Sequence, residues 1–177
     1  MARACDLILR AAAPEDAAAI AELGARAFCA AFAHLYVPED LAAFLAASHV
    51  PAKVLAELAD PRMRTHLAFD GEGRLLGFCK LVLGCAWPEY ARAPSVIELK
   101  QLYTDPDVTG QGVGAALMDW ALAQAASHGA GEVQLSVWSG NHGAQRFYSR
   151  YGFGKVADIH FRVGNQRDEE FLFAKVF

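Results

Sequence analysis

The sequence predicts a single mixed α/β domain over residues 1–177. A chain of this length can bury a full hydrophobic core without disulfides or metals. Its composition, 54% hydrophobic and 20% charged residues, is that of a globular protein. Segments with helical periodicity and segments with strand periodicity both occur along the chain, and we find no internal repeat, low-complexity segment or linker.

The first sixty residues predict one short strand followed by three helices. The strand covers residues 7–9. The helices are expected over residues 14–32, from residue 38 onwards, and over residues 51–60. Each helix begins with a proline, which fits the first helical turn. Acidic residues follow the first two prolines, where the helix dipole favours negative charge.

The middle of the chain has the pattern of extended strands. Apolar runs cover residues 65–69, 75–85 and 95–104. The sequence Asp-Gly-Glu-Gly at residues 70–73 is typical of a hairpin turn between the first two runs.

The last third predicts alternating helices and strands. A helix is expected over residues 112–128, a strand over 133–138, a helix after Asn141, and strands over 155–162 and 170–176. Asn141 is a typical N-cap residue, and glycines follow the ends of both helices, where they stop a helix.

A glycine-rich loop at residues 109–114, Thr-Gly-Gln-Gly-Val-Gly, precedes the 112–128 helix. Its glycines leave backbone N–H groups unobstructed, and the helix start adds free N–H groups and the positive end of the dipole. These features predict a site for a phosphate or pyrophosphate. A dinucleotide-binding fold competes with this interpretation. That fold, however, needs the loop after the first strand of a βαβ unit and an acidic residue about 20 positions later.

Charge, hydropathy and cysteine content argue against several classes of partner. The net charge is −4 and no basic block occurs, so we expect no nucleic acid. No run of 18 apolar residues and no signal-peptide pattern occur, so we expect no membrane span and a cytoplasmic location. The cysteines form no C-x-x-C pair or metal-ligand cluster, so we expect reduced thiols and no metal. They are Cys5, Cys29, Cys79 and Cys85.

Two motifs resemble those of the GNAT superfamily of acyl-CoA-dependent N-acyltransferases. The first is Leu-Tyr-Thr-Asp-Pro at residues 102–106, followed by the glycine-rich loop. The second is Asn-His-Gly-Ala-Gln-Arg-Phe-Tyr at residues 141–148, closing with Tyr-Gly-Phe at 151–153. Residues 32–41 and 136–138 are also similar to the polyamine-acetylating branch.

The resemblance implies the fold and the co-substrate. The fold would be a mixed, mostly antiparallel sheet of six or seven strands, flanked by helices and split near the end of the 95–104 strand. The co-substrate would be acetyl-CoA, its pantetheine arm paired with strand backbone and its pyrophosphate on the loop. The expected binding residues are Leu102, Tyr103, Thr104, Thr109, Gly110, Gln111, Gly112, Val113, Gly114, Ala115 and Asn141. Thr109 departs from the family, which usually has Arg or Gln there, so we expect weaker binding that depends on main-chain hydrogen bonds.

Tyr148 and Glu98 are the candidate catalytic residues. Tyr148 lies on the apolar stripe of its helix, which is typical of core residues, but the resemblance implies that it protonates the departing CoA thiolate. Glu98 either faces solvent or is a desolvated base whose pKa is raised above about 4.3. A base is needed, directly or through water, because an amine is mostly protonated at neutral pH.

His34 and Tyr36 are candidate acceptor-binding residues. The resemblance places their helical segment, which also carries Glu39 and Asp40, at the wall of the acceptor pocket. Helix capping and surface polarity explain these side chains equally well. The segment Trp-Pro-Glu-Tyr at residues 87–90 is either another wall or a loop.

The expected function is transfer of an acetyl group from acetyl-CoA to a primary amine of a small molecule, by direct attack in a ternary complex. A polyamine-like acceptor is one candidate. Two alternatives stay open: acetylation of a protein N-terminus or lysine, and a non-catalytic acyl-CoA-binding sensor or subunit. A homodimer is likewise open, because the sequence does not determine the oligomeric state.

Overall fold

The computed structural model describes residues 7–177 and contains a seven-stranded sheet. The strands are β1 (Ile8–Ala11), β2 (Met63–Phe69), β3 (Leu75–Val82), β4 (Val96–Thr104), β5 (Glu132–Trp138), β6 (Gly154–Val163) and β7 (Gln166–Val176). Their order is β1-β2-β3-β4-β5-β7-β6, and only the β4–β5 pairing is parallel. The expected mixed, mostly antiparallel sheet is therefore confirmed.

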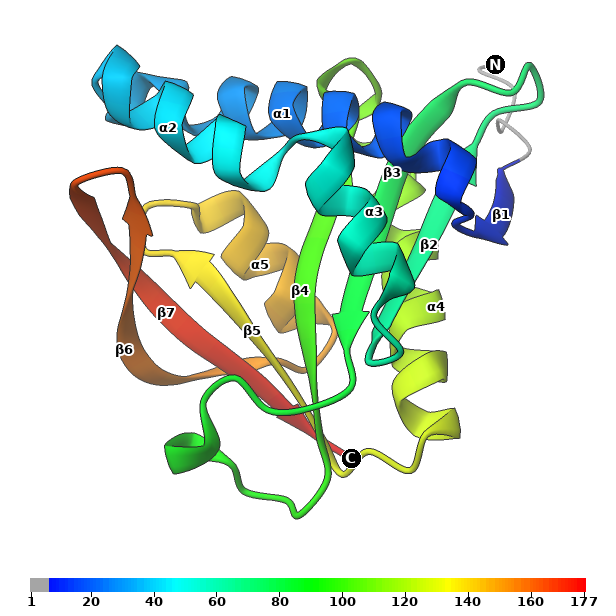
Figure 1. Ribbon diagram of the computed structural model, residues 1–177. Coiled ribbons are helices and arrows are strands. Elements are labelled where there is room, and N and C mark those ends of the chain that lie inside the picture. The colour runs from blue at the N-terminus through cyan, green and yellow to red at the C-terminus, as the bar shows by residue number, and fades with distance from the viewer. Residues whose placement is uncertain (1–6) are drawn as a thin grey trace.

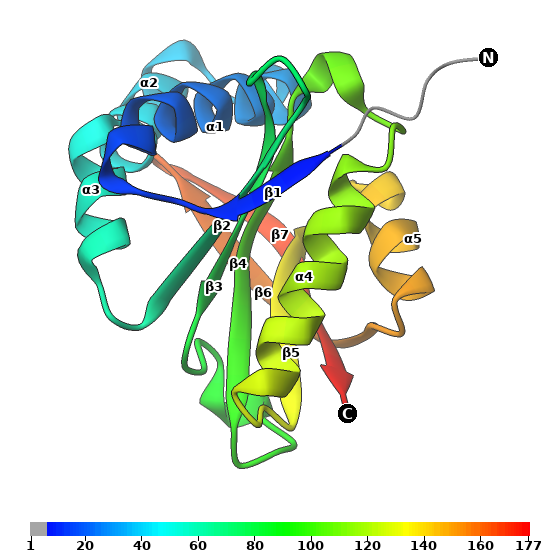
Figure 2. The same ribbon diagram turned by 90° about the vertical axis from the view of Figure 1, so that its right-hand side faces the viewer.

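Helices cover both faces of this sheet. They are α1 (Ala17–Phe32), α2 (Pro38–Ser48), α3 (Pro51–Ala59), α4 (Val113–Ser127) and α5 (His142–Arg150). Helices α1 to α3 lie on one face and α4 and α5 on the other (Figures 1 and 2). Four short 3-10 turns connect elements: η1 (Pro14–Asp16), η2 (Ala33–Leu35), η3 (Pro88–Tyr90) and η4 (Pro106–Val108).

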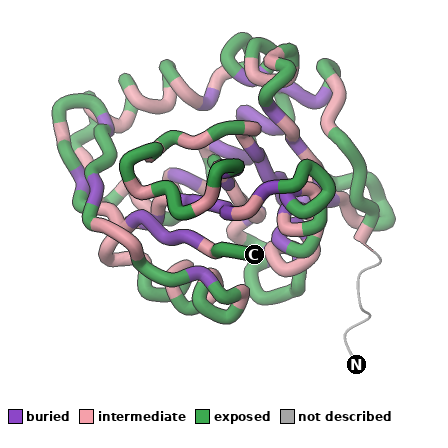
Figure 3. The backbone as a smooth tube through the Cα atoms, turned by 90° about the horizontal axis from the view of Figure 1, so that it is seen from below, coloured by how far each residue is buried: buried purple, intermediate pink, exposed green. Residues whose placement is uncertain are grey.

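The hydrophobic core has two parts, one on each face of the sheet. On the α1 face, Phe78 of β3 packs with Ile20 and Leu23 of α1. On the α4 face, Cys79 of β3 packs with Leu117 of α4. Adjacent strand residues thus point to opposite faces, as strand geometry requires. The buried segments concentrate in the strands at the centre of the molecule (Figure 3).

Two strand boundaries differ by three residues or more from those predicted. β3 ends at Val82 and not at residue 85, and β7 begins at Gln166 and not at residue 170. The second difference arises because β6 and β7 form a hairpin in which Val163 pairs with Gln166. Gly164 adopts φ 58° in its two-residue turn. The polar start of β7 carries no hydrophobic pattern, so periodicity alone could not reveal it.

Two stretches, Pro14–Leu35 and Pro38–Ala59, have the length and hydropathy of a membrane span by composition alone. In the fold, α2 and α3 are separated at residues 49–50, and α1 contributes Ile20, Leu23 and Phe28 to the core. The absence of a membrane span stays a prediction. Cys29, Cys79 and Cys85 are free thiols, whereas Cys5 lies outside the described residues.

Candidate active site

The parallel pairing of β4 with β5 is short, and a split opens in the sheet beyond it. Only residues 96–98 of β4 pair with residues 132–134 of β5. Past this point β4 stays with β3 and β5 stays with β7, so the two strands diverge (Figure 1). A bulge at Lys100 bends β4 near this point. The split therefore begins at Glu98, early in the strand, and not near the strand's end as the resemblance implied.

Backbone groups of β4 face the split beyond the bulge. The Asp105 N–H donates to the Leu76 carbonyl on the β3 side, at 2.7 Å. Because successive residues of an antiparallel strand direct their backbone groups to opposite sides, Tyr103 also faces β3. Leu102 and Thr104 consequently direct their N–H and C=O groups into the split. These are the backbone groups free to pair with an extended ligand.

The glycine-rich loop leads into the N-terminus of α4 and presents uncapped N–H groups. Gly110 and Gly112 adopt φ 78° and 87°, which only glycine adopts readily. Gly112 is the N-cap and makes no side-chain capping bond. The N–H groups of residues 113–115 have no partner within the helix, and its first turn carries no acidic residue. This exposed helix start is suited to bind a pyrophosphate.

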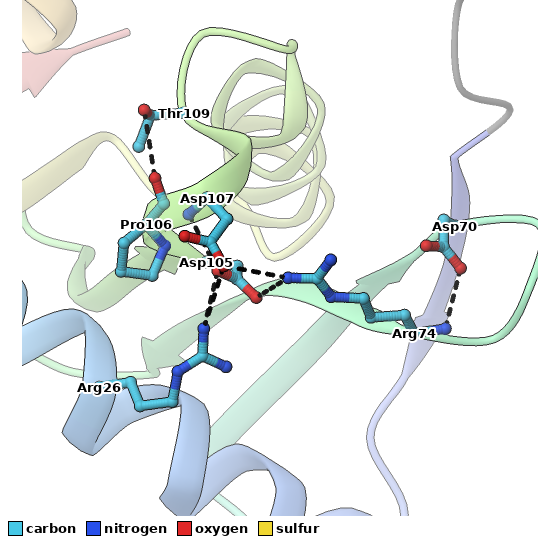
Figure 4. A network of polar contacts seen from close by, with 7 residues as sticks. All are labelled: Arg26, Asp70, Arg74, Asp105, Pro106, Asp107 and Thr109. Carbon is cyan, nitrogen blue, oxygen red and sulfur yellow. Dashed lines mark hydrogen bonds and ion pairs between the residues drawn. The ribbon is translucent and has the colours of Figure 1, made fainter.

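Asp105 anchors the segment between β4 and this loop (Figure 4). Its side chain, 1% exposed, accepts hydrogen bonds from Arg26 at 3.0 Å and from Arg74 at 2.7 Å. It also accepts the Asp107 N–H at 3.0 Å, which caps η4. Burial alone would raise the pKa of the Asp105 carboxyl, but these donors together lower it. Thr109 is exposed, and its hydroxyl donates only to the Pro106 carbonyl at 3.5 Å.

Helix α5 is positioned by its N-cap and by contacts with α4. The Asn141 side chain accepts the Ala144 N–H at 3.0 Å, which confirms the capping role; its contact with a cofactor stays a prediction. The Tyr151 hydroxyl donates to the Ala115 carbonyl of α4 at 3.4 Å. A shallow depression on the outer face carries two guanidinium groups; it is lined by His142, Gln145, Arg146, Ser149 and Arg150.

Tyr148 of α5 packs against the core on the α4 face of the sheet. Its ring packs edge-on against Phe153, with centroids 6.0 Å apart. Burial raises the pKa of the Tyr148 hydroxyl, with smaller contributions from the Cys79 thiol and the Tyr103 hydroxyl. The hydroxyl of Tyr148 therefore remains protonated, and able to donate, through the neutral pH range.

Glu98 lies where the split begins. Ile97 and Leu99 point into the core under α4, so Glu98 points to the opposite face. The side chain is partly buried; burial raises the pKa of its carboxyl, and Lys100 acts against the rise. This environment agrees with the desolvated alternative, but its role as the base stays a prediction.

On the α1 face, the α1–α2 segment and the β6–β7 hairpin meet over the split. The Tyr36 hydroxyl donates to the Asp168 carboxylate of β7. The Asn165 N–H at the hairpin tip donates to the Asp40 carboxylate at 2.9 Å. These bonds join parts of the chain that are 132 and 125 residues apart.

The two hydrogen bonds close the α1 face at this point, and aromatic pairs add further contacts there. Phe32 at the end of α1 meets Trp138 at the end of β5 edge-on, with centroids 6.1 Å apart. Phe44 of α2 meets Phe161 of β6 in the same way, at 5.7 Å. Rings from α1, α2, β5 and β6 thus come together on the α1 face of the sheet.

Not every predicted acceptor residue lies at this closure. His34 is exposed in η2, so the structure brings Tyr36, and not His34, to β7. The 87–90 segment forms η3 in the β3–β4 loop, at the end of the sheet where β4 begins. Among residues 7–177, no group of His, Cys, Asp and Glu side chains is arranged to hold a metal ion.

Three acidic residues at the site were not predicted: Asp105, Asp168 and Glu170. Asp105 precedes a proline in the first motif, a pattern typical of a capping side chain, and this signal could have revealed it. Asp168, Glu170 and Leu172 are every second residue of β7, so their side chains lie on the same face of the sheet. Placing the start of that strand at residue 170 left Asp168 in a loop and concealed the shared face.

Comparison with known proteins agrees with this geometry. The sequence model of the acetyltransferase (GNAT) family matches residues 19–153. The chain belongs to this family. An uncharacterized N-acetyltransferase of Mycobacterium tuberculosis strain H37Rv is 34% identical over 160 residues, which cover 90% of this chain and 97% of the relative. This GNAT protein is an acetyl-CoA-dependent N-acetyltransferase.

Solved GNAT structures share the whole fold. The PaiA N-acetyltransferase of Thermoplasma acidophilum, in complex with coenzyme A, superimposes with a TM-score of 0.79 at 21% identity and covers 97% of this chain and 99% of its own. The Salmonella typhimurium protein yncA, solved with acetyl-CoA, superimposes with a TM-score of 0.72 at 18% identity. The match covers 97% of this chain and 94% of the yncA chain.

Proposed function

We propose that this GNAT enzyme acetylates a primary amine of a small molecule by direct attack in a ternary complex. The observation that carries the proposal is the closure of the α1 face. Two hydrogen bonds, Tyr36 to Asp168 and Asn165 to Asp40, tie the α1–α2 segment to the β6–β7 hairpin. An open groove would suit a polypeptide better than this closed side does. The cytoplasmic location expected from the sequence is part of the same proposal.

The backbone of the split would orient the thioester. Acetyl-CoA would lie with its pyrophosphate on the N-terminus of α4 and its pantetheine arm along the free groups of Leu102 and Thr104. The same N–H groups would polarise the thioester carbonyl as negative charge develops on its oxygen. Holding the amine against the carbonyl carbon would supply much of the rate enhancement.

The proton transfers would use the two predicted catalytic residues. The amine nitrogen attacks the carbonyl carbon and its proton passes to Glu98, directly or through water. The C–S bond then breaks, and the departing sulfur takes the proton of the Tyr148 hydroxyl. Proton return from Glu98 to Tyr148 through solvent restores the enzyme, and the products are the amide and free CoA.

A panel of acceptors tests the proposal. CoA release should be measured with small primary amines, amino acids, and peptides bearing a free N-terminus or lysine. Small amines should support turnover and peptides should not. An Asp40→Ala variant, which removes the hairpin bond, should widen the acceptor range. Turnover with peptides alone would show a protein acceptor, and tight acetyl-CoA binding without any turnover would show a sensor; either result contradicts the proposal.

A further inference from the structure

Glu170 lies in the acceptor side of the split. On β7 it shares a face with Asp168, which is bonded to Tyr36, so Glu170 also points to the α1 face. Its charge raises the pKa of Tyr36 on the α1–α2 segment and of Tyr103 on β4. Glu170 is therefore near enough to both hydroxyls to act on them electrostatically.

The protein satisfies the Glu170 carboxyl only in part: burial and the Asp168 carboxylate raise its pKa, whereas a hydrogen bond with the Ser136 side chain favours its charged form. The Oε2 atom of Glu170 is buried and has no hydrogen-bond partner among the described residues. Within residues 7–177, neither Glu170 nor Asp168 belongs to an ion pair, and the two oxygens of Asp168 are occupied by Tyr36 and Gln166. A buried carboxylate oxygen without a donor is costly, and a cationic ligand would remove that cost.

The surroundings of Glu170 also suit an organic cation. Trp138 of β5 is its direct neighbour in the strand register. Phe32 packs edge-on against Trp138, and the Tyr36 hydroxyl donates to Asp168 on the same face of β7. Aromatic faces attract ammonium groups, and carboxylates bind them through charge-assisted hydrogen bonds.

We propose that Glu170, supported by Asp168 and Tyr36, binds a second positive charge of the acceptor and so makes the enzyme selective for diamines and longer polyamines. The inference rests on the proposed function and specifies its substrate class. One amino group would be acetylated at the split while another pairs with the free Oε2 of Glu170. Glu170 is thus a specificity residue and takes no part in the bond changes.

Matched amines test this assignment. Steady-state CoA release should be compared for 1-aminobutane and 1,4-diaminobutane in the wild type, Glu170→Gln and Glu169→Gln. Glu169 is exposed and points to the other face of β7, so it is the matched control. The wild type should prefer the diamine, and Glu170→Gln should reduce that preference about tenfold through KM, because one charged hydrogen bond is lost. Glu169→Gln should keep the wild-type preference.

Two outcomes would overturn the inference. One is a wild type without preference for the diamine; the other is a Glu170→Gln variant that keeps the preference or loses kcat equally for both amines. Calorimetric titration of 1,4-diaminobutane into the CoA-bound enzyme gives a readout independent of turnover. Weaker diamine binding in Glu170→Gln would support the assignment even if no amine were acetylated. A lack of acetylation would contradict only the proposed function.

Discussion

The ring of His49 lies parallel to the ring of Tyr103, with centroids 6.0 Å apart and planes 7° apart. This stack connects the end of α2 to β4 beside the split. His49 is buried, and its Nε2 atom has no hydrogen-bond partner among the described residues. Burial, with a further contribution from Lys80 and opposed by Glu57, lowers the pKa of His49 to about 4.

The His49 environment predicts a loss of stability in acid. Because the pKa of His49 is lower in the folded than in the unfolded state, protonation favours unfolding as pH falls from 6.5 towards 4. By pH 4 the free energy of unfolding should have dropped by about 3 kcal/mol from this group. Urea unfolding should be measured at several pH values between 7 and 4. The free energy of unfolding should fall less steeply with decreasing pH in His49→Phe than in the wild type. His160→Phe, at an exposed histidine, should keep the wild-type slope; equal slopes in all three proteins would contradict the prediction.

Removing the Tyr148 hydroxyl should slow turnover without disturbing the fold. Phenylalanine keeps the packing against Phe153 but cannot protonate the departing thiolate. In Tyr148→Phe, kcat should fall by about 100-fold or more, while the dissociation constant of acetyl-CoA stays unchanged. Tyr90→Phe, in η3 of the β3–β4 loop, is the matched control and should retain turnover. Full activity of Tyr148→Phe in steady-state assays would show that this residue is only part of the core.

The pH–rate profile tests Glu98. Burial raises the pKa of this carboxyl, so protonation should stop it from acting as a base as the pH falls through that raised value. In the wild type, kcat/KM should fall with decreasing pH because both Glu98 and the acceptor amine become protonated. In Glu98→Gln, only the decrease caused by protonation of the amine should remain. Glu89→Gln, at an exposed position in η3, should behave like the wild type. An unchanged profile in Glu98→Gln would remove Glu98 from the mechanism.

Replacing Thr109 with arginine should tighten acetyl-CoA binding. The exposed threonine contributes no charge beside the N-terminus of α4, and a guanidinium there could reach the pyrophosphate. The dissociation constant should fall about threefold to tenfold at low salt, with the gain shrinking as ionic strength rises. Thr109→Ser, which keeps the hydroxyl, is the control. Equal affinities by calorimetry would mean that the backbone alone saturates the site.

Asp105 should be required for both stability and co-substrate binding. Asp105→Ala removes a buried cap and the shared partner of Arg26 and Arg74, which should lower the free energy of unfolding by about 2–4 kcal/mol. The KM for acetyl-CoA should rise as well, because the glycine-rich loop follows this anchor. Asp107→Ala is the matched control, since its carboxylate is 73% exposed and lies 3.8 Å and 3.6 Å from the same arginines. Similar losses in both variants by urea unfolding would argue against a specific role of Asp105.

The sequence by itself determined the element order, the family and the co-substrate. These features are local: the spacing of apolar residues sets each helix and strand, and the glycine-rich loop and the Asn141 cap act through neighbouring backbone. All the predicted helices and strands are present, and the errors lie at boundaries such as the polar start of β7.

Only the tertiary structure decided where the split opens and what surrounds it. The bulge at Lys100 depends on the register between β3 and β4, which no local pattern encodes. The bond from Tyr36 to Asp168 spans 132 residues, and the free oxygen of Glu170 becomes apparent only when β7 lies beside β5. Long-range contacts depend on how the strands are ordered in the sheet, and for that reason they were beyond the reach of periodicity and motif.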